Sequence, residues 1–121
     1  MRFPEDDLAA LAAAEEIEIE TRATDGTVRR TIVWPVVRDG VAYLRSYRGP
    51  SGRWYREALA DPAVALHVDG RRLAARAEHA PDAASVEACS EALRAKYRRS
   101  QSLAAMLVPA VLPTTIRVVP E

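Results

Sequence analysis

Polar and apolar residues alternate with a period of two along much of the chain, which is the pattern of β-strands with one solvated face. In the segment EIEIETRA, Ile17, Ile19 and Thr21 fall on one side and glutamates on the other. Such patterns predict about six short strands, at 16–23, 28–37, 41–47, 62–68, 71–80 and 114–120. Because Pro35 cannot donate to a sheet ladder, we expect a bulge or an edge position within the second strand.

Turn and helix signals lie between these strands. Asp-Gly pairs at 25–26, 39–40 and 69–70 favour the positive φ of tight hairpin turns. Apolar spacing, prolines and first-turn acids predict helices at 4–16, 54–60, 81–100 and 101–109.

This order of elements predicts a mainly β (α+β) fold, built around a small antiparallel barrel with helices at its periphery. A doubly wound α/β sheet is disfavoured because the first three strands have no crossover helices between them. The chain has 121 residues and shows no repeat or linker, so residues 1–121 are expected to form a single domain.

Composition narrows the class of protein further. Hydrophobic residues make up 49% of the chain and charged residues 28%, which are globular values. No apolar run approaches the roughly 18 residues of a membrane helix, and the acidic N-terminus lacks the features of a secretory signal. The one cysteine, Cys89, cannot form an internal disulfide. We therefore expect a cytoplasmic protein.

Positive charge is concentrated in the middle of the chain, although the net charge is zero. Residues 22–76 hold eleven arginines and five acids, a surplus of six positive charges. The zero net charge argues against a general nucleic-acid binder. The placement of the arginines is therefore more informative than their number.

The segment SYRGPSGR, at 46–53, has the composition of an anion-binding loop. Gly49 and Gly52 can leave backbone N–H groups accessible, and Ser46 and Ser51 add hydroxyls. A helix that begins just after this loop would aim the positive end of its dipole at the same place. We expect the loop to hold a phosphate.

Three arginines, Arg45, Arg48 and Arg53, can reach the same region, where their forked donors could grip an anion. The alternative is a solubilising surface loop whose Trp54 and Tyr55 cap the barrel.

The second predicted strand faces this loop in a meandering barrel. Its Arg29, Arg30, Thr31 and Trp34 would then lie within reach of a ligand along the third strand. For Trp34, a place in the core or in a dimer interface is the alternative to a ligand contact. Tyr43, on the third strand, is expected to pack in the interior.

The remaining candidates for chemistry are His67, His79 and Cys89. The histidines have no cysteine and no second histidine at metal-ligand spacing, so no metal is expected. Cys89 falls on the apolar stripe of a predicted helix, which is typical of a packed, inert thiol. Redox chemistry in this protein would therefore depend on a bound cofactor.

The order of these motifs resembles the split β-barrel flavin and deazaflavin oxidoreductases, and their deazaflavin-dependent nitroreductase-like branch in particular. The similarity runs through TRATDGTVRRTIVW, VAYLRSYRG, RWYREALADPAVAL and GRRLAARA, roughly residues 21–77. Those proteins show a Gly-x-x-Arg-x-x-Pro hairpin, a V-A-S-x-G-G strand end and a W-Y-x-N-L-x-A-N-P-x-V segment. The chain also resembles a bacterial family of unknown function in the same superfamily.

The resemblance implies a six-stranded antiparallel split β-barrel of the FMN-binding type and assigns roles to three segments. The hairpin arm that approaches the cofactor corresponds to Arg29, Arg30 and Thr31. The strand end near the cofactor corresponds to Ser46, Tyr47, Arg48 and Gly49, and the aromatic pair after it to Trp54 and Tyr55.

Several positions depart from the family pattern. Many deazaflavin enzymes have G-R-K-S-G where this chain has A-T-D-G, at 23–26. Val33 replaces the hairpin proline, Pro50 the second loop glycine and Ala58 the helix asparagine. These departures leave FMN, a deazaflavin and no bound cofactor all open.

The leading hypothesis is an oxidoreductase that holds FMN or a deazaflavin and transfers a hydride to a small organic acceptor. Arg30, Arg48 and Arg53 would neutralise the phosphate, and Tyr47 is the candidate proton donor. The first alternative is a non-catalytic split barrel that binds a cofactor, a haem-related ligand or another phosphate-bearing ligand. The second is a small barrel that binds single-stranded nucleic acid.

A barrel of this size cannot enclose a whole flavin and also fill its own core. The ligand would therefore lie in a surface groove, and the resemblance implies that a second subunit completes it. We expect a homodimer on that ground.

Overall fold

Strand β2 (Val28–Val33) is followed by Trp34 and Pro35, which belong to no strand. The chain then forms strand β3 (Val36–Arg38). In this computed structural model, which describes residues 2–121, β2 and β3 lie at opposite edges of one sheet. The expected break at Pro35 is therefore a crossing from one edge to the other. Because the predicted second strand is two strands, the sheet has seven strands rather than six.

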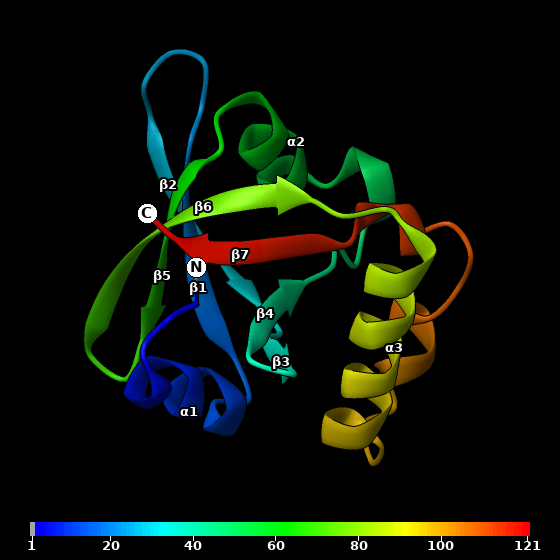
Figure 1. Cartoon of the computed structure of the whole chain (residues 1–121). Helices are drawn as coiled ribbons and strands as arrows, with labels where there is room; N and C mark the ends of the chain where they lie inside the picture. Colours follow the sequence, from blue (N-terminus) through cyan, green and yellow to red (C-terminus); the bar gives the residue numbers. More distant parts are fainter. Residues whose placement is uncertain (1) are drawn as a thin grey trace.

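The sheet is antiparallel throughout and runs in the order β2-β1-β5-β6-β7-β4-β3. Its other strands are β1 (Ile17–Arg22), β4 (Val41–Leu44), β5 (Ala63–Val68), β6 (Arg71–His79) and β7 (Ile116–Pro120). The sheet curls into a half-barrel, with the β1–β2 hairpin projecting beyond its rim (Figure 1).

All three predicted Asp-Gly hairpins are confirmed. At 39–40 and 69–70 both residues have positive φ, as a two-residue type I′ turn requires. At 25–26 only Gly26 does, with φ of 90°, because the hairpin is closed by a longer loop in which the Ala23 N–H donates to the Thr27 carbonyl.

The three main predicted helices are also present, as α1 (Glu5–Ala13), α2 (Arg53–Ala60) and α3 (Ala83–Tyr97). The Asp82 carboxylate caps α3 by accepting the Ser85 N–H. The helix predicted at 101–109 is instead a short 3₁₀ turn, η2 (Leu103–Met106), and Pro109 restricts the chain just beyond it. Two further 3₁₀ turns are η1 (Gly49–Ser51) and η3 (Leu112–Thr114).

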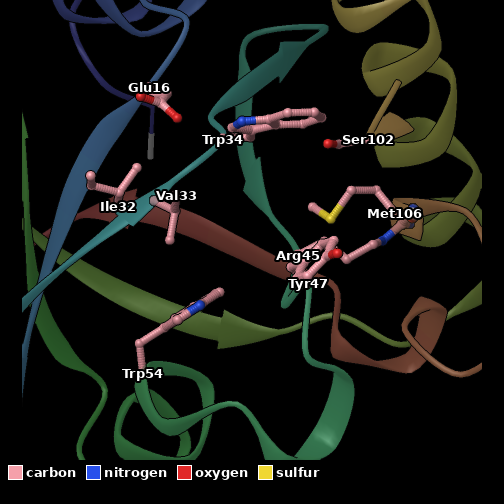
Figure 2. Close-up of a pocket in the computed structure, with 9 residues that line it drawn as sticks. All are labelled: Glu16, Ile32, Val33, Trp34, Arg45, Tyr47, Trp54, Ser102 and Met106. Atoms are coloured by element: carbon pink, nitrogen blue, oxygen red, sulfur yellow. The ribbon is translucent and has the colours of Figure 1, made fainter. Parts of the chain in front are cut away.

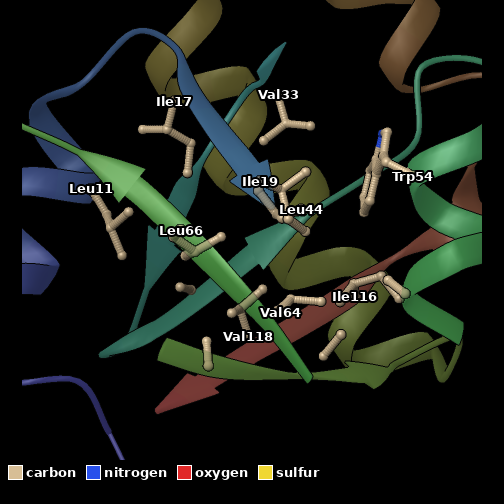
Figure 3. Packing of buried hydrophobic residues seen from close by; sticks show 14 of the residues in the cluster. Leu11, Ile17, Ile19, Val33, Leu44, Trp54, Val64, Leu66, Ile116 and Val118 are labelled. Atoms are coloured by element: carbon tan, nitrogen blue, oxygen red, sulfur yellow. The ribbon is translucent and has the colours of Figure 1, made fainter. Parts of the chain in front are cut away.

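Apolar side chains from α1, α2 and most strands meet inside the half-barrel (Figure 3). The alternation predicted for β1 is confirmed, since Ile17, Ile19 and Thr21 are all buried. A second cluster lies between α3 and the β3–β4 edge and includes Tyr43 and Cys89, both buried as expected. No helix within residues 2–121 is long and apolar enough to cross a membrane.

The crossing at Pro35 is held by the C-terminal end of α3. The Pro35 carbonyl accepts hydrogen bonds from Lys96 Nζ at 2.6 Å and from the Tyr97 hydroxyl at 3.2 Å. The Trp34 ring stacks on the Tyr97 ring, with 4.0 Å between centroids. Burial raises the pKa of Tyr97 and lowers the pKa of Lys96 to about 8. These contacts fix the path by which β2 is connected to β3.

Glu20 on β1 joins three strands through its carboxylate. It binds Arg72 of β6 at 2.8 Å and His67 of β5 at 2.8 Å. Hydrogen bonds from Arg72 and then His67 lower the pKa of Glu20 from 4.5 to about 2. A carboxylate with a lowered folded pKa stabilises the fold above its unfolded pKa, and this contribution is lost as pH falls toward the folded value.

We expect Glu20→Gln to lower the free energy of unfolding at pH 7, with the difference from the unaltered protein shrinking as pH falls from 5 toward 2. Urea unfolding across this pH range measures it. Glu18→Gln is the matched control, because Glu18 lies on the same strand as Glu20 but its pair with Arg30 is more exposed and should contribute little. An equal deficit for Glu20→Gln at pH 7 and pH 3 would contradict this account.

Candidate functional site

Two cavities adjoin between β2 and the chain that follows β4. We call the first the basic cleft; it has a volume of about 510 Å³ and is lined by Thr31, Ile32, 46–48, 51–54 and Arg56. We call the second the aromatic cavity; it has a volume of about 330 Å³. Both volumes fall in the range of small-molecule sites, roughly 300–1,000 Å³.

The aromatic cavity is lined by residues 32–34, Arg45, Tyr47, Trp54 and Met106, with Glu16 and Ser102 completing it. Figure 2 shows the two tryptophans on opposite sides of this cavity, with the β2 residues to one side and Met106 to the other. Ile32, Tyr47 and Trp54 line both cavities, so the two form one continuous groove.

Hydrogen bonds within the loop fix its shape. The Ser46 hydroxyl donates to the Gly49 carbonyl at 2.8 Å, and the Ser46 N–H donates to Thr114 Oγ1. The N–H groups of Gly49 and Gly52 donate to the carbonyls of Ser46 and Gly49. Of the loop N–H groups expected to face an anion, those of Ser46, Gly49 and Gly52 are therefore engaged within the protein.

The two glycines serve the loop in different ways. Gly49 has φ of 69°, a conformation that favours glycine, and it is buried rather than lining the cleft. Gly52 has an ordinary φ, but a Cβ at this position would overlap the hydroxyl oxygen of Ser46. Gly52 is therefore needed for close packing of the loop against the start of α2.

Three arginines border the basic cleft without a carboxylate partner. Within residues 2–121, no acid lies within 4 Å of the guanidinium groups of Arg48, Arg53 or Arg56. Arg56 donates only to the Ser51 carbonyl, at 3.3 Å. All three side chains are exposed, so their charge is available to a ligand.

Two further donors belong to residues that line the same cleft. No side chain caps the N-terminus of α2, whose first N–H groups and positive dipole end lie at the 52–54 wall of the cleft. Thr31 Oγ1 is buried and has no hydrogen-bond partner, which is uncommon for a buried hydroxyl. The cleft therefore offers donors and positive charge, and its chemistry fits an oxyanion such as a phosphate.

Most of the residues predicted for the site are brought together. Thr31, Ser46, Tyr47, Arg48 and Arg53 all line the basic cleft. Trp34 lines the aromatic cavity while its other contact is the stack on Tyr97. Trp54 lines both cavities and is nearly buried.

Four predicted residues line neither cavity: Gly49, Arg29, Arg30 and Tyr55. Arg29 forms an ion pair with Glu57 of α2 at 3.0 Å. Arg30 lies on the face of β2 opposite to Thr31, as strand alternation requires, and pairs with Glu18. The Tyr55 hydroxyl is bonded to the His79 ring, 3.1 Å away.

Arg45, expected to reach the loop's anion, points instead toward α3 and is 2% exposed. Arg56 was missed, although its spacing of three from Arg53 places both on one face of a helix. Met106 and Ser102 had no sequence signal, because they reach the cavity from a distant turn through tertiary packing.

Neither histidine lines either cavity. His67 binds Glu20, and His79 binds Tyr55 and the Pro113 carbonyl. Cys89 is buried, and burial raises the pKa of its thiol to about 11. Residues 2–121 contain no group of three or more histidine, cysteine or acidic side chains placed to hold a metal ion.

A family model matches residues 7–118, so the chain belongs to the family described as an uncharacterized protein conserved in bacteria (DUF2255). No curated protein matches the sequence. Among solved structures, the chain is similar to a pyridoxamine-5′-phosphate-oxidase-like protein from Listeria innocua, with a TM-score of 0.69 and 17% identity over 97% of this chain and 92% of that one.

Two further structures show the same fold. An F420 reductase has a TM-score of 0.67 and 21% identity, covering 98% of this chain and 96% of that one. HutZ, the heme storage protein from Vibrio cholerae, has a TM-score of 0.67 and 12% identity, covering 100% and 92%. The curled antiparallel sheet and these neighbours are therefore consistent with the predicted split-barrel type of fold. Identities this low show the fold alone.

We expect Gly52→Ala to lower the free energy of unfolding by about 1–3 kcal/mol, because the added methyl group displaces the Ser46 hydroxyl. Chemical denaturation measures the loss. Ser46→Ala removes the clashing oxygen, so the double variant should lose less stability than the sum of the two single variants. Additive losses would show that the glycine does not act through Ser46.

Proposed function

We propose that this protein is an oxidoreductase that binds FMN or a deazaflavin in the groove and transfers a hydride to a small organic acceptor. The observation that carries the proposal is the basic cleft, which is lined by arginines without acid partners, an uncapped helix N-terminus and Thr31, whose buried hydroxyl has no partner. The similarity in fold to an F420 reductase and to a pyridoxamine-5′-phosphate-oxidase-like protein supports it.

The phosphate of the cofactor would lie in the basic cleft. Arg48 and Arg53 would hold it through charge-assisted hydrogen bonds, and Thr31 Oγ1 would gain the partner that it lacks. Arg56, on the same face of α2 as Arg53, would add positive charge. The N-terminus of α2 would contribute its dipole.

The ring system would extend toward the aromatic cavity along the shared wall of Ile32, Tyr47 and Trp54. The acceptor would then occupy the aromatic cavity, next to the ring. Trp34 and Trp54 would exclude water and fix the plane of the acceptor. Tyr47, which is exposed and lines both cavities, could donate a proton to the reduced acceptor.

A bound flavin or deazaflavin supplies the hydride, so that the reduced cofactor loses two electrons and a proton and the acceptor gains them. The protein's own residues bind the phosphate, orient the ring and shield the acceptor. The groove is open toward solvent at Ile32 and Tyr47, which are 61% and 63% exposed. We propose that a second copy of the chain covers this rim in a homodimer.

The second candidate function is a non-catalytic carrier of the same kind of ligand. The similarity in fold to a heme storage protein supports this candidate. Haem itself fits this groove poorly, because both histidines are engaged in other contacts outside the two cavities. A carrier would therefore hold a phosphate-bearing ligand in the same basic cleft.

We expect Arg48→Ala to weaken cofactor binding by more than about tenfold, the loss of one charge-assisted contact. Absorbance or fluorescence titration with FMN and with a deazaflavin measures the change. Arg38→Ala is the control, because Arg38 lies on β3, pairs with Glu91 and borders neither cavity. Equal affinities for Arg48→Ala and the unaltered protein would remove Arg48 from the proposed site.

Turnover separates the enzyme from the carrier. We expect the protein to accelerate oxidation of chemically reduced FMN or deazaflavin by quinone or nitro acceptors, measured anaerobically by the return of the oxidised absorbance band. Trp34→Ala should slow this reaction more than it weakens cofactor binding, because the indole lines only the aromatic cavity. Tight cofactor binding without acceleration would favour the carrier instead.

A further inference from the structure

Arg45 is a buried arginine with only neutral partners. Its guanidinium donates from Nε to Thr115 Oγ1, from Nη1 to Ser90 Oγ and the Met106 carbonyl, and from Nη2 to the Val86 carbonyl. These four bonds connect the residue that follows β4 to α3 and to the chain that follows α3. Since a guanidinium has five N–H donors, one N–H of Nη2 has no partner within residues 2–121.

The guanidinium of Arg45 forms no ion pair with any of the described residues. No carboxylate lies within 4 Å of it, and its side chain is 2% exposed. The more exposed arginines Arg29 and Arg72, by contrast, each pair with a glutamate. Burial without an acid partner disfavours the charged form and lowers the pKa of Arg45. Because buried charges in proteins are ordinarily paired, an anion from outside the chain is a suitable partner for Arg45.

Arg45 also lines the aromatic cavity. Figure 2 shows its side chain extending toward Met106, on the side of the cavity away from Glu16. Glu16 is the one acid that lines this cavity in the part of the chain that the structure describes. The cavity therefore has a positive end at Arg45, a negative end at Glu16 and aromatic walls between them.

We propose that Arg45 recognises an anionic group on the acceptor, so that the aromatic cavity selects planar organic molecules that carry a carboxylate. The carboxylate would lie at the Arg45 end and accept the remaining N–H of Nη2. The body of the molecule would lie between Trp34 and Trp54. Glu16 determines the orientation of the acceptor in the cavity, because an acceptor carboxylate at the Glu16 end would be repelled by the like charge of Glu16.

This inference names the substrate class of the proposed oxidoreductase and so rests on that proposed function, but it can be tested without the cofactor. The probes are 4-nitrobenzoate and 4-nitrobenzamide, which differ only in the charge of one planar group. Binding to cofactor-free protein can be followed by quenching of tryptophan fluorescence at low ionic strength. We expect 4-nitrobenzoate to bind at least about tenfold more tightly, the effect of one charge-assisted contact.

Two variants locate the source of the preference. Arg45→Gln should bring the ratio of the two affinities close to one, whereas Arg48→Gln, which alters the basic cleft, should leave the ratio unchanged. A purely structural role of Arg45 would instead lower thermal stability and weaken both probes equally.

The comparison in the unaltered protein decides the proposal even if Arg45→Gln does not fold. Equal affinities for the two probes would overturn it. Loss of the preference in Arg48→Gln would also overturn it, because the carboxylate would then lie in the basic cleft. Absence of FMN or deazaflavin binding would affect the proposed cofactor but not this measurement.

Discussion

The structure depends on a set of contacts, here called the clamp, by which the C-terminal end of α3 holds the crossing at Pro35. A proline carbonyl at the crossing accepts hydrogen bonds from both Lys96 and Tyr97, and the Trp34 indole stacks on the Tyr97 ring. Because proline removes a sheet donor, the chain can leave β2 there without giving up a ladder bond. The clamp fixes where β2 ends and thus which β2 residues face the chain after β4. Both cavities lie between these two segments, so their shape follows from the crossing.

Charge pairing divides the arginines of this protein into two groups. Arg29, Arg30, Arg71 and Arg72 each pair with an acid of a neighbouring element. Arg48 and Arg53 border the basic cleft with no such partner, and Arg45 is buried with neutral acceptors only. Surface pairs contribute little to stability. Arginines directed at a shared cavity without an acid are, in contrast, suited to binding an anion that the chain does not supply.

Local signals in the sequence predicted most of the fold. Period-two alternation located β1, Asp-Gly pairs located three hairpins, and apolar spacing located α3. The crossing at Pro35 was not predicted, because a proline in an extended segment indicates a break but not where the chain goes next. The 3₁₀ turn at Leu103–Met106 was overpredicted as a helix, since composition alone does not distinguish one turn from several.

The candidate site was predicted only in part, because local signals in the sequence do not show which distant residues meet. The 46–54 segment carries its chemistry in consecutive residues, and the structure places most of them around the basic cleft. Arg29 and Arg30 were expected beside them, but Glu57 and Glu18 lie within reach of their guanidinium groups and pair with them. The Arg29–Glu57 pair depends on α2 packing over β1, which no local pattern encodes. The Arg30–Glu18 pair depends on the register of the β1–β2 hairpin. The partners of Arg45 are likewise far apart in the sequence, at 86, 90, 106 and 115.

The central claim is that the basic cleft binds the phosphate of a flavin-type ligand. Calorimetric titration with FMN and with riboflavin, which has the same ring system without the phosphate, tests it most directly. The account predicts that FMN binds at least about tenfold more tightly and that the difference shrinks as salt is added, since exposed arginines are screened. Equal affinities for the two ligands, or a preference for riboflavin, would contradict it.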